Sequence, residues 1–261
     1  MSGGKPLDGV KVLITRGQSG ASETASRIQA EGGIPVVVPL LKFEARIDPS
    51  EKEWGGSLHT YDWILFTSKN GVHFFLEAMD RMGVSLSTLG VRCAAVGEKT
   101  ANYCEKRGIP IDFIPTEYTG DAFASEFIQA MDGNAKVLVP KGNLARNVIS
   151  EELNRSGMTC HEWIVYETVL PEESGDILKH VLERKEADII TFTSSSTVHH
   201  FMKVVKSHSL GHFIEGVPMA CIGPITKETA EQYGLHVKIS PKVYTVNEMV
   251  EAIKTYIQQH D

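Results

Sequence analysis

The sequence predicts an α/β protein with two similar lobes, each a parallel sheet flanked by helices, joined by a two-stranded β linker. The first observation is an internal repeat, in which Phe66-Thr67-Ser68 recurs as Phe192-Thr193-Ser194 after 126 residues. The second is the alternation of short apolar runs with amphipathic segments, which is typical of parallel sheets covered by helices on both faces. The third is a pair of extended segments, 34–45 and 163–170, that no helix follows.

The repeat extends over most of the chain in two registers. At a shift of 126 residues the matches include Val96-Gly97 with Ile222-Gly223, Thr100 with Thr226, and Tyr118-Thr119 with Tyr244-Thr245. A shift of 125 residues matches Lys11-Val12-Leu13-Ile14 with Lys136-Val137-Leu138-Val139. A period of this size is that of a domain, well above that of a solenoid repeat. The chain therefore consists of two copies of one α/β unit.

Strands are expected where a short apolar run is bounded by glycine, proline or serine, and helices where an amphipathic segment follows. The expected strands are 11–15, 63–67, 91–96, 111–114, 137–139, 188–193, 219–222 and 237–239. The expected helices are 22–30, 70–82, 99–107, 121–131, 148–155, 198–207, 226–233 and 247–258. Ser22 and Asp121 are expected to cap their helices, and Gly32 and Gly108 to end theirs. This order of elements is flavodoxin-like.

The two extended segments predict how the lobes are connected. They are rich in β-branched residues and prolines, and they lie at matching points of the repeat. We expect them to form an antiparallel link, with linker residues at about 35–45 and 163–170. The first lobe is then discontinuous, 1–37 plus 170–261, and the second lobe, 42–165, is inserted into it. The alternative is two consecutive lobes divided near Asn134.

Composition narrows the class of protein. The 261 residues are 42% hydrophobic and 23% charged, as in ordinary soluble proteins, and a net charge of −7 argues against a nucleic-acid partner. The four cysteines lack metal-binding spacing and are expected to be reduced thiols of a cytoplasmic protein. No signal peptide and no membrane-length apolar stretch is visible, so we expect no membrane partner. We also expect a monomer.

Six strand-to-helix turns form the predicted ligand site, in an active cleft between the lobes. Ligands of open parallel sheets bind beyond the carboxyl ends of strands, where free N–H groups and the helix dipole favour anions. The turns are 66–71, 192–197, 96–100, 222–226, 16–20 and 141–143. For each turn the alternative is that its hydroxyl groups only cap their own helix. The candidate binding residues are Arg16, Thr67, Ser68, Lys69, Asn70, Gly71, Gly97, Thr100, Lys141, Thr193, Ser194, Ser195, Ser196, Gly223, Pro224 and Thr226.

Motifs for covalent, nucleotide or metal chemistry are not found in the sequence. It contains no G-x-S-x-G elbow, no G-x-G-x-x-G fingerprint and no phosphate-binding P-loop. His199 and His200 are neighbours on an expected helix, where adjacent side chains point about 100° apart, so a surface or capping role is favoured over a metal. We therefore expect a protein without metal or cofactor that works by binding, orientation and electrostatics.

The order and spacing of these segments resemble those of the uroporphyrinogen-III synthase family. Trp163-Ile164-Val165-Tyr166-Glu167-Thr168 is similar to the family's linker, which carries a tyrosine facing the cleft. The other similar segments are 13–16, 64–72, 94–97, 190–194 and 221–224 with Thr226. Members usually have a threonine directly after the Gly-Pro pair, whereas here Ile225 intervenes. That departure leaves Thr226 and a backbone N–H as alternatives for the contact.

The resemblance implies a lyase of tetrapyrrole, porphyrin and haem biosynthesis that cyclises hydroxymethylbilane to uroporphyrinogen III without a cofactor. The linear tetrapyrrole loses hydroxide from ring A to give a cationic azafulvene. Ring D attacks through its substituted carbon, forms a spiro intermediate, breaks away and closes inverted, and water is lost overall. The resemblance places Tyr166 as the donor of a hydrogen bond to the departing hydroxide, with a packed linker aromatic as the alternative. The substrate's many carboxylates would be held by N–H groups, Arg16, Lys69 and Lys141.

Two other classes of protein remain open at this point. One is a two-lobed cytosolic binding protein that closes on an anionic metabolite without chemistry. The other is a two-lobed transferase, although no pyrophosphate site is evident in the sequence. Turnover of hydroxymethylbilane distinguishes both from the synthase.

Overall fold

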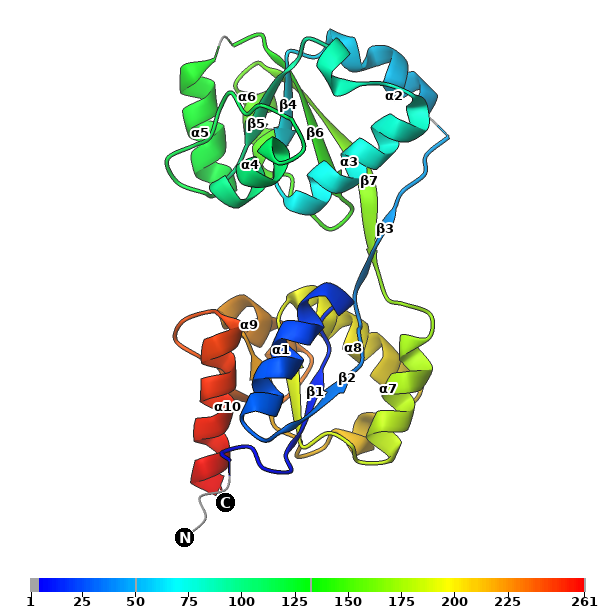
Figure 1. Cartoon of the computed structure of the whole chain (residues 1–261), viewed down its shortest axis with the longest axis vertical. Coiled ribbons are helices and arrows are strands. Elements are labelled where there is room, and N and C mark those ends of the chain that lie inside the picture. The colour runs from blue at the N-terminus through cyan, green and yellow to red at the C-terminus, as the bar shows by residue number, and fades with distance from the viewer. Residues whose placement is uncertain (1–4, 50, 132, 261) are drawn as a thin grey trace. The chain divides into compact units, whose positions relative to one another are not determined.

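The computed structural model describes residues 5–49, 51–131 and 133–260, which form two compact units (Figure 1). Unit 1 comprises Met1–Lys42 and Val169–Asp261, and unit 2 comprises Phe43–Thr168. Each unit contains a five-stranded sheet. The predicted fold class is confirmed, because both sheets are mostly parallel and are flanked by helices.

The sheet of unit 1 has the strand order β10-β9-β8-β1-β2, and neighbouring strands are parallel. The strands are β1 (Lys11–Ile14), β2 (Ile34–Val37), β8 (Ile189–Phe192), β9 (Met219–Cys221) and β10 (Val237–Ile239). The helices are α1 (Gln18–Ala30), α7 (Ser174–Glu183), α8 (Ser195–Ser207), α9 (Pro224–Gln232) and α10 (Val246–His260). A short 3-10 helix, η3, spans Gly211–Phe213.

The sheet of unit 2 has the strand order β3-β7-β6-β4-β5, in which β5, β4, β6 and β7 are parallel. The strands are β3 (Lys42–Ala45), β4 (Trp63–Phe66), β5 (Arg92–Ala95), β6 (Lys136–Gly142) and β7 (Thr159–Val169). The helices are α2 (Glu51–Ser57), α3 (Lys69–Met82), α4 (Glu98–Glu105), α5 (Gly120–Ala130) and α6 (Val148–Arg155). Two 3-10 helices are η1 (Leu58–Thr60) and η2 (Leu86–Thr88).

Each central strand buries both of its faces, which is why its sequence is continuously apolar. In β1, Leu13 packs with α7 and α8, while Val12 and Ile14 pack with α1 and α10. In β4, Phe66 packs with α3 and α4, and Leu65 packs with α5 and α6. Figure 1 shows the resulting helix layers on the two faces of each sheet. These layers hold the strands rigidly, so the turns at the strand ends have fixed starting points.

The predicted strand 111–114 is wrong. Only an isolated parallel bridge joins Phe113 to Ala94 of β5. The Asp112 carboxylate accepts the Cys93 N–H at 2.9 Å, so a side chain takes the place of a main-chain ladder contact. Pro110 and Pro115 flank the segment and bring no N–H of their own. Residues 111–114 are therefore a short extended connection.

Several helix predictions also needed correction. The helices α2 and α7 were not predicted, and α1 begins at Gln18, four residues before the expected start. Gly17, and not Ser22, is the N-cap residue of α1. The cap of α5 is Thr119, whose hydroxyl accepts the Ala122 N–H at 3.2 Å, while Asp121 lies inside the helix. Within the described residues, no helix is long and apolar enough to cross a membrane.

The residues of the two expected linker segments belong to strands of different sheets. Ile34–Val37 is strand β2 and belongs to the sheet of unit 1, whereas β3 is a neighbour of β7 in the sheet of unit 2. The Arg46 N–H donates to the Val165 carbonyl at 3.0 Å just after β3. Strand β7 is 11 residues long and includes Tyr166. Strands β3 and β7 thus carry the chain into and out of unit 2.

Candidate functional site

The turn between β4 and α3 carries five of the predicted binding residues. The Ser68 hydroxyl accepts the Gly71 N–H at 3.0 Å and caps α3. Gly71 is required because a Cβ there would lie 2.9 Å from the Pro140 carbonyl oxygen at the end of β6. Thr67 and Asn70 are half-buried, and Lys69 is exposed, with no acidic partner among the described residues. Ser68 thus serves its helix, and Lys69 presents an unpaired positive charge.

The equivalent turn of unit 1 connects β8 to α8. The Ser194 hydroxyl accepts the Thr197 N–H at 3.3 Å, so this turn repeats the cap. The Ser195 hydroxyl contacts the Thr229 hydroxyl of α9 at 2.8 Å. Thr193 and Ser196 are half-buried at the same end of the sheet. Two of its four predicted hydroxyl residues are therefore engaged in local contacts.

The turns at Gly97 and Gly223 precede α4 and α9. Thr100 and Thr226 lie in the first turns of these helices with 8% and 6% of their surface exposed. Within the described parts of the chain, neither hydroxyl has a hydrogen-bond partner. Pro224 is the first residue of α9 and lacks an N–H, which suits a position whose N–H would have no intrahelical acceptor. Both turns therefore combine free N–H groups with an unpaired hydroxyl.

The glycines of these turns are explained by two tyrosines. A Cβ at Gly97 would lie 3.2 Å from the Tyr118 ring, and one at Gly223 would lie 3.2 Å from the Tyr244 ring. Backbone conformation is not the reason, since both glycines are extended at φ −166° and −168°. Sequence reasoning matched Tyr118 with Tyr244 through the repeat but gave neither residue a function.

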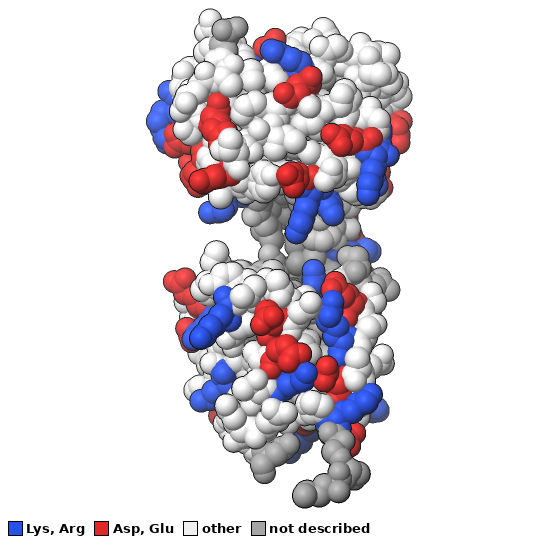
Figure 2. All heavy atoms as spheres, turned by 60° about the vertical axis from the view of Figure 1, so that its left-hand side comes forward, with Lys and Arg blue, Asp and Glu red and all other residues white. Residues whose placement is uncertain are grey.

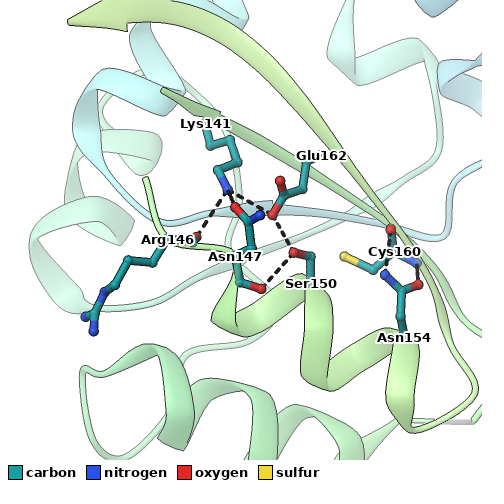
Figure 3. A network of polar contacts seen from close by, with 7 residues as sticks. All are labelled: Lys141, Arg146, Asn147, Ser150, Asn154, Cys160 and Glu162. Atoms are coloured by element: carbon teal, nitrogen blue, oxygen red, sulfur yellow. Dashed lines mark hydrogen bonds and ion pairs between the residues drawn. The ribbon is translucent and has the colours of Figure 1, made fainter. Parts of the chain in front are cut away.

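Lys141 was predicted to be a cation that faces the substrate, and the structure places its ammonium group in a network of internal contacts. It is only 3% exposed, and its ammonium group donates to the Arg146 carbonyl at 3.1 Å, Asn147 Oδ1 at 2.6 Å and Glu162 Oε1 at 2.9 Å (Figure 3). The Ser150 hydroxyl contacts the same Glu162 oxygen. All three protons of the ammonium group are therefore used internally. No local pattern indicates this pairing, because Glu162 lies on the neighbouring strand β7.

The cation that this turn does present is Arg146. Its side chain is exposed and points away from the Lys141 network in Figure 3, and among the described residues it has no acidic partner. In unit 1 the counterpart is Arg16, half-buried and likewise without an acidic partner in the described ranges. A Cβ at Gly20 would collide with Arg16 Nε, so the guanidinium lies over the first turn of α1.

Tyr166 lies in β7 and is 8% exposed. Its ring is stacked on Phe74 at a centroid distance of 5.1 Å and meets the edge of Phe43 at 5.6 Å. A Cβ at Gly142 would lie 2.8 Å from the Tyr166 hydroxyl oxygen, so only glycine fits beside it. None of the described residues forms a hydrogen bond with that hydroxyl.

A β-bulge sets the direction of Tyr166. Lys141 pairs with Ile164, but Gly142 pairs with Tyr166, so β7 has one extra residue at this point. Bulges re-aim side chains next to functional sites. The Asn143 N–H donates to the Tyr166 carbonyl at 3.1 Å and locks the new register. Tyr166 is thus both a packed aromatic and a free hydroxyl donor.

A cavity of about 190 Å³ at the strand carboxyl ends of unit 2 joins three of the predicted turns. Thr67, Val96 and Lys141 line it, together with Gly120 at the start of α5 and the exposed Arg146. Two larger hollows, of 560 and 790 Å³, lie at the amino ends of the strands, beside Met219 and Cys93. They are equivalent in the repeat and lie away from the turns.

The placement of charged and titratable side chains does not resemble a metal site in the described residues. In the described part of the chain, no three His, Cys, Asp or Glu residues are arranged to hold a metal ion. His199 contacts the Tyr233 hydroxyl at 2.9 Å and His200 the Leu40 carbonyl at 2.5 Å. On the face shown in Figure 2, acidic and basic side chains are interspersed on both units. Positive charge and free donors at the turns therefore come from local N–H groups and single cations.

The cysteines are buried thiols. Loss of solvation raises the pKa of Cys93, Cys104, Cys160 and Cys221 to about 12. The thiolate is the nucleophilic form of cysteine, and it is scarce at neutral pH when the pKa is this high. These residues therefore serve packing.

Comparison with known proteins gives a consistent result. The family model described as "Uroporphyrinogen-III synthase HemD" matches residues 22–251. A putative uroporphyrinogen-III synthase of Methanocaldococcus jannaschii is 32% identical over 252 residues, which are 94% of this chain and 98% of that protein. The uroporphyrinogen-III synthase of Synechococcus elongatus is 27% identical over 264 residues, 98% of both chains.

Solved structures agree in fold. A uroporphyrinogen III synthase from Thermus thermophilus matches with a TM-score of 0.66 and 17% identity, over 96% of this chain and 99% of that chain. The uroporphyrinogen-III synthetase of Helicobacter pylori matches with a TM-score of 0.60 and 16% identity, over 95% and 99% of the two chains.

Proposed function

From the premise that this chain belongs to the uroporphyrinogen-III synthase family, we propose that its strand-end turns hold the substrate's carboxylates and that Tyr166 assists the loss of hydroxide. The family cyclises hydroxymethylbilane in tetrapyrrole biosynthesis, so the chain is a lyase-type cyclase. The observation that carries the proposal is repeated in both units: a glycine-capped helix start is followed by a largely buried threonine whose hydroxyl has no partner among the described residues.

Helix starts suit this substrate because carboxylates accept hydrogen bonds from free N–H groups and are attracted by the positive end of the helix dipole. The Thr100 and Thr226 hydroxyls add one donor each at the first turns of α4 and α9. Lys69, Arg16 and Arg146 supply positive charge at three other turns. Because the net charge is −7, these local groups and not the overall field must attract a polycarboxylate.

Tyr166 is suited to the departure of hydroxide. Negative charge develops on the leaving oxygen, and a fixed donor in a water-poor environment stabilises such charge better than bulk water does. The hydroxyl lies beside Gly142 on a side chain whose residue is 8% exposed, and the ring is held by Phe43 and Phe74. The proton need not be transferred fully, because one hydrogen bond to the developing hydroxide lowers the barrier. None of these steps requires a metal or cofactor.

The rest of the reaction requires positioning. Ring D attacks through its substituted carbon, separates from the spiro intermediate and closes through its other α-carbon. Uncatalysed closure proceeds without this inversion. Fixing the carboxylates of several rings at once restricts the bilane to the folded conformation that favours inversion, which is catalysis by orientation. We propose that the turns serve the substrate in this way, and that the protein acts as a cytoplasmic monomer without membrane or nucleic-acid partners.

Isomer analysis tests the proposal. Purified protein given hydroxymethylbilane should produce the type III isomer without added metal or nucleotide, while the enzyme-free control produces type I. Product containing only the type I isomer would show that the proposal is wrong and would favour an anion-binding protein or a transferase. Activity that is lost with a chelator and restored by a metal would contradict the cofactor-free reaction.

A further inference from the structure

The carboxylates of the substrate account for the polar turns, but not for the apolar side chains exposed beside them. Tyr118 is 54% exposed and Tyr244 is 61% exposed, although both are large aromatic residues. Each immediately precedes the threonine before a helix, Thr119 before α5 and Thr245 before α10. Tyr244 follows strand β10, and Tyr118 follows the extended connection 111–114 at the equivalent point of unit 2.

The two rings are held in the same way in the two units. Each tyrosine packs its Cβ and Cγ side against the cap glycine of the preceding helix. A Cβ added to Gly97 would lie 3.2 Å from these atoms of Tyr118, and one added to Gly223 would lie 3.2 to 3.6 Å from those of Tyr244. Each tyrosine nevertheless remains more than half exposed. The repeat shift of 126 residues relates Gly97 to Gly223 and Tyr118 to Tyr244, so one arrangement has been kept in two sequences that differ around it.

We propose that Tyr118 and Tyr244 contact the substrate as two aromatic platforms, one in each unit, on which pyrrole rings stack. This inference rests on the proposed function. A pyrrole is flat and rich in π electrons, and its acetate and propionate substituents extend from the ring edge. A ring lying on Tyr244 would bring its substituents toward the N–H groups at the start of α9 and the Thr226 hydroxyl. Platform and anion site then bind two parts of one ring.

The residues around the two platforms differ in charge. In unit 2 the helix after Gly97 begins with Glu98 and Lys99, whereas the helix after Gly223 begins with Pro224 and Ile225. The Glu98 carboxylate lies near the Tyr118 hydroxyl and raises the pKa of the phenol. Pro224 occupies the corresponding position in unit 1 and offers no acceptor.

This difference predicts unequal contributions. Glu98 places a negative charge next to the Tyr118 platform, where it repels a carboxylate of the substrate. Around Tyr244, Ile225 is 76% exposed and Val243 is 58% exposed, so the surroundings are apolar. We therefore expect the Tyr244 platform to contribute more to substrate binding than the Tyr118 platform.

The test compares binding with turnover in single variants. Tyr244→Ala is expected to raise KM for hydroxymethylbilane and Kd for uroporphyrinogen III by about 3- to 10-fold, the effect of one aromatic contact. Tyr118→Ala should have a smaller effect in the same direction, and kcat should change less than about 2-fold in both. Tyr244→Phe and Tyr118→Phe keep the ring and should bind like the wild type. Calorimetry under anaerobic conditions gives Kd.

A double substitution tests the contact with glycine. A Cβ at Gly97 must displace the Tyr118 ring, so the single variant Gly97→Ala should raise KM. In the double variant, Gly97→Ala should add no further increase to that of Tyr118→Ala. Tyr103→Ala and Tyr256→Ala remove half-buried tyrosines elsewhere on α4 and α10 and serve as controls. Circular dichroism verifies that each variant is folded.

The outcomes for the platforms and for the reaction can be told apart. Wild-type KM and Kd in both alanine variants, or a loss confined to kcat, overturn the platforms while the wild type still yields the type III isomer. A wild-type protein that does not convert hydroxymethylbilane overturns the proposed function and the platforms with it. Equal KM increases in the platform variants and in the control variants would also overturn the platforms, because they would indicate a general structural effect.

Discussion

The turn at Arg16-Gly17 in unit 1 and the turn at Lys141-Gly142 in unit 2 are copies of one motif whose side chains make different contacts. In unit 2 the cation is buried and paired with Glu162, and in unit 1 it has no acidic partner among the described residues. Gly142 makes room for the Tyr166 ring, whereas Gly17 faces the Leu41 carbonyl oxygen, 2.8 Å from the position of a Cβ. Leu41 and Tyr166 are themselves related by the repeat shift of 125 residues.

The difference shows how a duplicated scaffold divides its tasks. In unit 2 a buried ion pair, a β-bulge and a glycine position one tyrosine, so this end of β6 and β7 is rigid and suited to chemistry. In unit 1 the same backbone leaves a guanidinium over a helix start, which is suited to binding an anion. A cation followed by glycine can therefore be buried in an ion pair or left without an acidic partner. Which of the two occurs depends on the residues of the neighbouring strand.

Removing the buried cation should have the largest effect. Lys141→Ala leaves Glu162 and Asn147 without their partner, and breaking a buried ion pair typically costs about 3 kcal/mol or more. We expect the free energy of unfolding in urea to fall by about that amount. Because Trp54, Trp63 and Trp163 all lie in unit 2, tryptophan fluorescence should report this loss directly. Arg16→Ala is the matched control and should leave stability unchanged. Equal losses in the two variants would contradict the division described above.

Tyr166→Phe tests the chemical role of unit 2. Loss of one hydrogen bond to developing charge costs about 1.5–3 kcal/mol, so kcat should fall roughly 10- to 100-fold. The ring remains between Phe43 and Phe74, so the variant should fold normally. Tyr103→Phe serves as the control for removal of a phenol hydroxyl elsewhere in the unit. A Tyr166→Phe variant with wild-type kcat would reduce the residue to packing.

Several features of the fold were accessible from the sequence and others were not. The repeat and the unbroken apolar strands predicted the fold class, because both are local patterns that parallel packing produces directly. The family resemblance depended on the order of motifs and is confirmed by the comparisons. The strand at 111–114 was wrong because apolar residues alone do not form a ladder when Asp112 and two prolines alter its hydrogen bonds.

The site was harder to predict than the fold. Lys141 looked exposed because its acidic partner lies 21 residues away on the next strand, and only the register of β6 and β7 brings them together. Arg146 was overlooked because it follows no glycine. The packing of Tyr118 against Gly97 was also hidden, since the two residues are brought together by the fold and not by spacing. Partners that depend on tertiary packing leave no periodic signal.

Removing the cap serines should lower the free energy of unfolding by a smaller amount, and by nearly the same amount in the two units. Ser68→Ala removes a 3.0 Å contact to the Gly71 N–H, and Ser194→Ala removes a 3.3 Å contact to the Thr197 N–H. Each should lower the free energy of unfolding by about 1 kcal/mol, with the shorter contact giving the larger loss. Ser68→Asp and Ser194→Asp keep an acceptor and should restore much of it.

The cap variants also probe whether the units unfold together. Because all three tryptophans are in unit 2, an effect of Ser68→Ala should appear in fluorescence and in circular dichroism. An effect of Ser194→Ala should appear in circular dichroism alone if the units unfold separately. If Ser68→Ala or Ser194→Ala also raised KM for hydroxymethylbilane strongly, capping would not be the main role of the hydroxyl.

The smallest expected effect on substrate binding comes from removing Arg16 or Arg146, the cations without an acidic partner at the duplicated turns. Arg16→Ala and Arg146→Ala each remove one solvent-accessible cation, and exposed charge pairs are worth about 0.2–1 kcal/mol. KM for hydroxymethylbilane should therefore rise only about 2- to 5-fold, with kcat and stability unchanged. The increase should shrink in high salt, because screening already weakens the contact in the wild type. Arg16→Lys and Arg146→Lys keep the charge and should recover most of the affinity, while Lys203→Ala and Lys106→Ala remove exposed cations elsewhere in the two units as controls. If Lys141→Ala instead showed a salt-dependent KM effect with intact stability, the assignment of the binding cation to Arg146 would be wrong, and the two turns would be functionally alike after all.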